Sequence, residues 1–153
     1  MKHFCLLFLF IGMHINVTYA QTSEEANAKQ TIINFFEAFH RQDSIAIKKT
    51  VSSEVIMQTI GKDKQGVEVV KTANFSNFLK SIVGIPSEEK FEEKLLDFSV
   101  QVDGSMAHAW TPYEFWYNGT LSHCGVNSFQ LFKEKGVWKI IYIIDTRRKD
   151  NCQ

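Results

Sequence analysis

Apolar residues in the first half of the chain recur every three or four positions, the spacing of an α-helix. Thr22, followed three residues later by Glu25, forms a capping box that is typical of a helix start. One face of the helix that follows is apolar, with Ala28, Ile32, Phe35, Phe36 and Phe39. The pattern predicts one long amphipathic helix that begins near residue 22.

Two shorter helices are predicted further along the chain. Asp43 can cap the first of them, which runs through residues 45–47, and a connecting stretch around residues 61–66 follows it. Asn74 can cap the second, whose apolar residues are Phe75, Phe78, Leu79, Ile82 and Val83. Gly84, which tolerates left-handed backbone geometry, and Pro86, which breaks helices, are expected to end it.

From residue 95 onward, apolar and polar positions alternate as they do in a β-strand. Asp103-Gly104 and Asn118-Gly119 favour two-residue hairpin turns, and Glu-Lys-Gly at residues 134–136 gives a third, slightly longer turn. These turns predict a four-strand antiparallel meander over residues 95–102, 106–117, 120–132 and 137–147. Helices that precede such a meander must cover one face of it, so the expected fold class is α+β: a curved antiparallel sheet under about three N-terminal helices.

Two of the predicted strands are apolar on both faces. Residues 106–117 carry Tyr113 and Phe115 beside Trp110 and Trp116, and residues 137–147 carry isoleucines on both sides. Because an antiparallel sheet usually leaves one face in water, we expect both faces of this sheet to be covered. A homodimer through the face away from the helices would cover the second one.

The first twenty residues have the features of a secretory signal peptide. Lys2 and His3 precede an apolar run over residues 4–11 that is too short to span a bilayer, and Thr-Tyr-Ala at residues 18–20 suits signal peptidase. We therefore expect a signal peptide over residues 1–20 and a single domain over residues 21–153. The protein would be exported, periplasmic or extracellular, with no membrane contact after cleavage. A buried apolar N-terminal helix is the alternative.

Charge and cysteine content narrow the possible functions. The chain has 17 basic and 17 acidic residues; loss of Lys2 with the signal leaves 16 against 17, which gives no basic excess for nucleic acid. Loss of the signal also leaves two of the three cysteines, Cys124 and Cys152, which can form a disulfide in an exported protein, or can stay as unpaired thiols. No zinc-type spacing of Cys and His occurs, and we expect no metal and no cofactor.

Hairpin turns fix which residues of neighbouring strands face each other. Counting back from the turn at residues 118–119 pairs Glu114 with His123. If Lys133 pairs with Val137 across the last turn, His123 in turn lies opposite the end of the final strand. The polar cluster predicted from this register consists of Glu114, His123, Asp145 and Arg147.

Aromatic residues are predicted on the same face as this cluster, because side chains two apart on a strand point the same way. A carboxylate beside a histidine near apolar walls is the usual setting for acid/base chemistry, so His123 and Asp145 are candidate catalytic residues. Tyr113 belongs to the opposite face, mainly as a core residue whose hydroxyl could reach a cavity. The candidate ligand-binding residues are His108, Trp110, Tyr113, Glu114, Trp116 and Arg147.

A simpler interpretation of the cluster is a solvated row of opposite charges at the end of a hairpin. The predicted arrangement also depends on regular strands. A single β-bulge would move the residues of one strand to the opposite face.

The C-terminal half resembles a known superfamily. Residues 107–115, 123–125, 138–140 and 145–148 are similar to exported bacterial members of the nuclear transport factor 2-like superfamily, including lumazine-binding-like, SnoaL-like and polyketide-cyclase-like proteins. The resemblance implies a cone-shaped fold with a pocket between the helices and the concave sheet, and frequent dimerisation through the outer face. The tyrosine that ketosteroid isomerase carries on its first helix has no counterpart here, where Phe35, Phe36 and Phe39 stand.

Three functions are consistent with these features. The preferred one is an exported domain that binds a small apolar or aromatic molecule in an aromatic-lined pocket. The second is an acid/base enzyme of the isomerase, dehydratase or hydrolase type that uses His123, Asp145 and Arg147. The third is a dimerisation or docking module.

Overall fold

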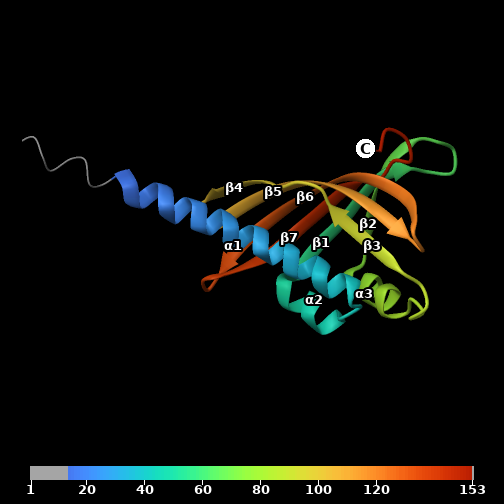
Figure 1. The fold of residues 1–153 in the computed structure, drawn as a ribbon, viewed down its shortest axis with the longest axis horizontal. Helices are drawn as coiled ribbons and strands as arrows, with labels where there is room; N and C mark the ends of the chain where they lie inside the picture. Colours follow the sequence, from blue (N-terminus) through green and yellow to red (C-terminus); the bar gives the residue numbers. More distant parts are fainter. Residues whose placement is uncertain (1–13, 153) are drawn as a thin grey trace, which may run out of the picture.

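The structure, a computed structural model, describes residues 14–152. A long helix lies across one side of a strongly curved sheet, and two short helices pack near the end of that helix (Figure 1). The helices are α1 (His14–His40), α2 (Ser44–Thr50) and α3 (Phe75–Val83). The strands are β1 (Val51–Lys62), β2 (Glu68–Ala73), β3 (Phe91–Leu95), β4 (Ser99–Asp103), β5 (Met106–Tyr117), β6 (Thr120–Glu134) and β7 (Val137–Thr146). The predicted α+β cone fold is confirmed.

The predicted signal peptide, residues 1–20, lies largely outside the described residues. Its last part is helical, because α1 begins at His14 and not near Thr22 as the capping box predicted. The sequence between these two positions holds no proline or glycine that would stop a helix, so the capping-box residues lie within α1. Among residues 14–152, no helix combines the length and the apolar character that crossing a membrane requires.

The sheet is larger than the predicted meander. Its strand order is β2-β1-β7-β6-β5-β3, with β4 also paired to β5. The hairpin β1–β2 was not predicted, although its turn, residues 63–67, lies where a connection around residues 61–66 was expected. Strand β1 runs parallel to β7, so the sheet is mixed rather than purely antiparallel. The polar start of β1, Ser-Ser-Glu at residues 52–54, hides its alternation from a search by apolar spacing.

The predicted first strand of the meander, residues 95–102, is not continuous: it covers only the last residue of β3 and most of β4. Both β3 and β4 pair with β5, and residues 96–98 separate them. The turn at residues 118–119 has positive φ at both positions and pairs Tyr117 with Thr120, as predicted. The last turn differs: it has two residues and pairs Glu134 with Val137, so the predicted pairing of Lys133 with Val137 is wrong.

The caps of the short helices are largely as predicted. The Asp43 side chain accepts hydrogen bonds from the first turn of α2, and Asn74 caps α3. Gly84 ends α3 with φ of −80°, so it is not the left-handed residue that we expected. Leu79 and Ile82 are buried, whereas Val83, in the last turn of α3, is 54% exposed.

The hydrophobic core lies between α1 and the concave face of the sheet. Phe35, Phe36 and Phe39 of α1 are buried there, and Phe36 meets the fully buried Phe129 of β6 edge to face, with ring centroids 6.1 Å apart. Burying each such ring contributes on the order of 2 kcal/mol. Large aromatic side chains therefore fill the centre of the cone.

Candidate functional site

The two faces of β5 divide the predicted site residues. Tyr113 and Phe115 point to the concave face, toward the helices, whereas the even-numbered residues point to the convex face. The prediction that the tryptophans frame the charged cluster is therefore wrong. The candidates that lie on the convex face, away from Asp145 and His123, are His108, Trp110, Glu114 and Trp116.

Two β-bulges explain the error. Phe115 pairs with His123 and Trp116 with Leu121, so Ser122 is an extra residue, and His123 faces Phe115 instead of Glu114. A second irregularity, at Ile141, shifts β7 against β6, so that Asn127 lies opposite Asp145. Three members of the predicted cluster, His123, Asp145 and Arg147, remain neighbours, and Glu114 leaves it.

Asp145 is the centre of the polar group on the concave face. Its side chain is 7% exposed and accepts three hydrogen bonds. Thr59 Oγ1 donates to Oδ1 at 2.6 Å, whereas the Tyr113 hydroxyl at 3.0 Å and Arg147 Nε at 2.8 Å share Oδ2. Strands β1, β5 and β7 thus converge on one carboxylate, which is a rigid arrangement.

Tyr113 is almost fully buried, and its hydroxyl lies 3.0 Å from both Asp145 Oδ2 and the Thr146 carbonyl oxygen. Burial and the nearby carboxylates of Asp145 and Glu93 raise the pKa of Tyr113 above its ordinary value. The hydroxyl therefore keeps its proton and acts as a donor. The expectation that Tyr113 is remote from the charged cluster is wrong.

Glu93 belongs to this site although the sequence did not single it out. It lies on β3, partly buried, and its Oε1 accepts a hydrogen bond of 2.7 Å from Asn127 Nδ2. Burial and, to a smaller extent, the charge of Asp145 raise the pKa of Glu93 to about 7, against the opposing effects of Asn127 and Arg147. Glu93 can therefore gain or lose a proton near neutral pH.

His123 is partly buried beside this group. Its ring stacks on Phe115 with centroids 4.9 Å apart and meets Tyr113 edge to face at 5.9 Å. Burial, together with the positive charges of Arg147 and Lys149, lowers the pKa of His123 despite the opposing charge of Asp145. The imidazole is therefore neutral at neutral pH. We call Glu93, Tyr113, His123, Asn127, Asp145 and Arg147 the concave polar cluster.

A signal for the missed residues is present in the sequence. Residues 91–95 read Phe-Glu-Glu-Lys-Leu, and strand alternation puts Glu93 on the same face as Phe91 and Leu95. Asn127 likewise falls on the face of Phe129. A polar residue on an apolar strand face is a candidate for function, but β3 had to be recognised as a strand before this could be used.

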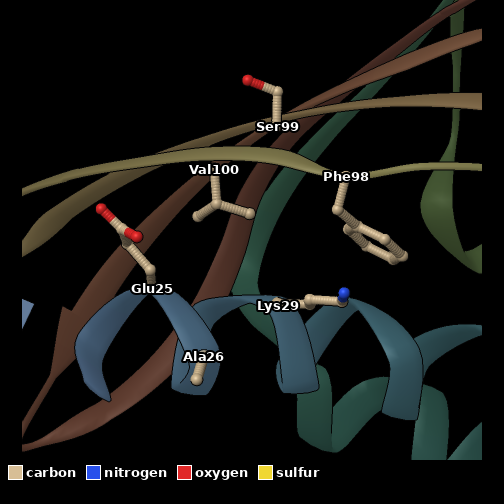
Figure 2. A pocket seen from close by; sticks show the side chains of 6 residues that line it. All are labelled: Glu25, Ala26, Lys29, Phe98, Ser99 and Val100. Atoms are coloured by element: carbon tan, nitrogen blue, oxygen red, sulfur yellow. The ribbon is translucent and has the colours of Figure 1, made fainter. Parts of the chain in front are cut away.

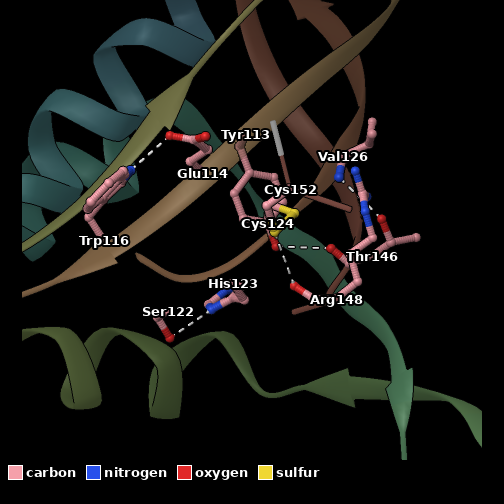
Figure 3. Close-up of a disulfide and its surroundings, with 10 residues drawn as sticks. All are labelled: Tyr113, Glu114, Trp116, Ser122, His123, Cys124, Val126, Thr146, Arg148 and Cys152. Atoms are coloured by element: carbon pink, nitrogen blue, oxygen red, sulfur yellow. Dashed lines mark hydrogen bonds between the residues drawn. A yellow bond between two sulfur atoms is a disulfide. The ribbon is translucent and has the colours of Figure 1, made fainter. Parts of the chain in front are cut away.

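A disulfide holds the C-terminal end of the chain beside the concave polar cluster (Figure 3). The structure joins Cys124 of β6 to Cys152, with Cα atoms 5.6 Å apart, which is the pairing expected from the even cysteine count. Cys124 also exchanges two backbone hydrogen bonds of 3.0 Å with Arg148. Arg147, which lies next to this pair, is thereby held at the edge of the site.

The convex residues make contacts of their own. Trp116 Nε1 donates to Glu114 at 2.9 Å (Figure 3), and Lys94 Nζ lies 4.6 Å from the centre of a Trp116 ring. His108 Nε2 lies 3.1 Å from Ser128 Oγ. None of these contacts involves a residue of the concave polar cluster.

An open groove of about 400 Å³ lies between α1 and the start of β4 (Figure 2). Neither predicted wall residue, Trp110 or Trp116, takes part in it. The lining residues are Glu25, Ala26, Lys29, Phe98, Ser99 and Val100. Lys29 Nζ lies 4.6 Å from the centre of the Phe98 ring, so the cation already covers the aromatic surface of the groove.

No metal centre is formed within residues 14–152, where His, Cys, Asp and Glu side chains do not gather in groups of three or more that could hold an ion. The concave polar cluster has the chemistry of a site for organic molecules: two carboxyl groups, a neutral imidazole, an amide, a phenol and a guanidinium. These groups can hydrogen-bond a ligand and exchange protons with it.

The fold is that of the nuclear transport factor 2-like proteins. Such a protein of unknown function from Pseudomonas putida has a TM-score of 0.66 at 15% identity, over 85% of this chain and 90% of that one. Another from Shewanella baltica has a TM-score of 0.62 at 15% identity, over 84% and 97%. A candidate dehydratase of the same family from Streptomyces avermitilis has a TM-score of 0.62 at 14% identity, over 83% and 97%. No protein-family profile and no curated protein sequence matches this chain.

Proposed function

We propose that this protein is an exported domain that binds a small, partly aromatic organic molecule at the concave polar cluster. The observation that carries the proposal is the convergence of Glu93, Tyr113 and Asp145 on one face beside partly buried rings. Phe91, Phe115 and His123 supply a row of rings, with 6.4 Å between the first two and 4.9 Å between the last two. A flat apolar ligand would pack on the rings while the polar groups orient it.

A titration with defined probes tests this proposal. Phenol, benzoate and cyclohexanone present a hydroxyl, a carboxylate and a carbonyl on similar six-membered rings. We expect at least one of them to shift the backbone amide signals of Tyr113, His123 and Asn127 in two-dimensional NMR, and His123→Ala to weaken that shift. The matched control, His108→Ala on the convex face, should leave it unchanged. Shifts confined to convex residues, or none up to millimolar probe, would contradict the proposal.

The second candidate function is acid/base catalysis in the same site. Glu93, with a pKa of about 7, can donate and accept a proton at neutral pH, and the neutral His123 can act as a base. The dehydratase assignment of the Streptomyces avermitilis protein agrees with such chemistry, at the level of shared fold. The test is whether the protein exchanges the α-protons of cyclohexanone for deuterium. Exchange that is lost in Glu93→Gln and kept in the control Glu68→Gln would support catalysis. Equal exchange in both variants and in buffer would count against it.

Export is a further part of the proposal. It rests on the signal-like first twenty residues and on the paired Cys124 and Cys152, which require an oxidising compartment to form a lasting bond. N-terminal sequencing of the secreted protein should read Gln21 as its first residue. Retention of residues 1–20 in the mature protein would contradict this part.

We also propose that two copies associate through the convex face. Large apolar side chains are exposed there: Trp110 is 49% exposed, Phe132 46% and Met106 56%. Trp110→Glu should turn the dimer into a monomer in sedimentation analysis, whereas Lys71→Glu on the distant strand β2 should not. A wild-type protein that is monomeric at high micromolar concentration would overturn this part.

A further inference from the structure

His40, in the last turn of α1, makes a hydrogen bond that an ordinary helix-terminal histidine does not make. The backbone N–H of Glu93 donates to His40 Nε2 at 2.9 Å. The partners are 53 residues apart in the chain, so this bond connects the end of α1 to the middle of β3. The helix dipole alone would explain a histidine in the last turn of a helix, but not this bond.

The surroundings of His40 keep its ring in one place and in one protonation state. Phe39 meets it edge to face at 5.5 Å, and Phe36 and Phe91 lie at 6.3 and 6.4 Å. Burial lowers the pKa of His40, and the charge of Glu92 opposes this only in part. A neutral ring whose Nε2 accepts must carry its proton on Nδ1.

We propose that His40 is a positioning residue that holds Glu93 in the concave polar cluster. This inference rests on the proposed function of that cluster. The bond fixes the backbone of Glu93 at the point where its side chain turns toward Asn127, so one residue is held at both ends. Without the acceptor, the N–H of Glu93 would lose its partner, β3 would loosen there, and water would reach the carboxyl group.

Protonation of His40 would have the same consequence, since an imidazolium cannot accept a hydrogen bond. The charged groups that bear on this pair are Glu92 beside His40, and Asp145 and Arg147 beside Glu93. Acidification therefore acts on the site through α1 as well as through Glu93 itself.

NMR of the wild-type protein tests the bond directly. A nitrogen–nitrogen coupling across the hydrogen bond between Glu93 N and His40 Nε2 should be detectable, and the ring should be the Nδ1–H tautomer. The Nε2–H tautomer at neutral pH would overturn the proposal, because that nitrogen could then not accept. This measurement needs no variant.

Variants test what the bond does. His40→Phe keeps a ring but removes the acceptor, whereas His40→Gln can place an oxygen near the position of Nε2. NMR of the side-chain carboxyl carbon of Glu93 measures its pKa. In His40→Phe this pKa should fall by about one unit toward its ordinary value, because hydration of the carboxyl group removes the effect of burial. It should return most of the way to the wild-type value in His40→Gln.

Phe78→Leu is the control for destabilisation alone. Phe78 stacks on Phe39 at 6.0 Å but does not touch the bond, so its truncation should lower stability and leave the pKa of Glu93 unchanged. An unchanged pKa of Glu93 in His40→Phe would overturn the positioning role of His40 and leave the proposed function of the cluster standing. An ordinary Glu93 pKa in the wild type would instead remove the acid/base part of the proposed function, while the bond could still be seen in the coupling measurement.

Discussion

Replacing Gly125 by alanine should damage the fold and the concave polar cluster together. Gly125 lies in β6 between the disulfide residue Cys124 and the site. A Cβ atom added there would lie 1.8 Å from the carbonyl oxygen of Thr146 and 2.9 Å from Cε1 of Tyr113. The first contact is with backbone, which no side-chain rotation can relieve. Strands β6 and β7 would have to separate at this point.

The structure allows the cost to be worked out roughly. Overpacking of a rigid site costs about 1–3 kcal/mol, with the upper end appropriate where backbone must move. The displaced carbonyl of Thr146 also accepts from the Tyr113 hydroxyl, and losing that bond costs about 1 kcal/mol more. We therefore expect Gly125→Ala to lower the free energy of unfolding by about 4 kcal/mol.

Urea unfolding followed by fluorescence measures this loss. Gly61→Ala is the matched control, because nothing lies within 4 Å of its added Cβ atom, and it should change stability by less than about 1 kcal/mol. A loss below about 1 kcal/mol in Gly125→Ala, with an unshifted Tyr113 ring signal in NMR, would refute the close packing of β6, β7 and Tyr113.

Three further changes have defined outcomes. The pKa of Glu93 is about 7 in the folded protein against an ordinary 4.5, so its contribution to stability is full below pH 4.5 and is lost as the pH rises through 7. Urea unfolding at several pH values should show this decline in the wild type, and Glu93→Gln should abolish it. Cys152→Ser should lower the free energy of unfolding by about 3.5 kcal/mol, because the disulfide joins residues 28 positions apart. Reductant should lower the free energy of unfolding of the wild type by the same amount and leave that of the variant unchanged. Tyr113→Phe should cost about 1 kcal/mol in thermal or urea unfolding, and a neutral outcome would mean that the Asp145 contact contributes nothing.

Much of the fold could be predicted because local signals agreed with each other. Asp43 and Asn74 cap helices where their side chains suggested, and the turn at residues 118–119 has the pairing that its Asn-Gly sequence favours. These features depend on a few neighbouring residues. The hairpin β1–β2 has no such signal, since its strands are mostly polar; β1 is held by pairing with β7, and β2 by pairing with β1.

The site could be predicted only in part, because it depends on register over long strands. The extra residue Ser122 in β6 moves His123 from a place opposite Glu114 to a place opposite Phe115. Nothing in the residues around 122 marks a bulge, and a shift of one position exchanges the two faces of a strand. Asp145 and Arg147 stayed together because they are two residues apart at the end of β7, which no bulge between strands can change.

The position of the concave polar cluster follows from where α1 stops. Along α1, Phe35, Phe36 and Phe39 fill the space above the sheet, so a ligand has no room there. At His40 the helix ends, and the chain turns away with Gln42 at a positive φ of 57°. Beyond that point the side chains of α1 no longer cover the concave face, and the concave polar cluster lies there beside the rings of Phe91 and Phe115. The length of α1 thus decides how much of the cone is core and how much can serve as a site.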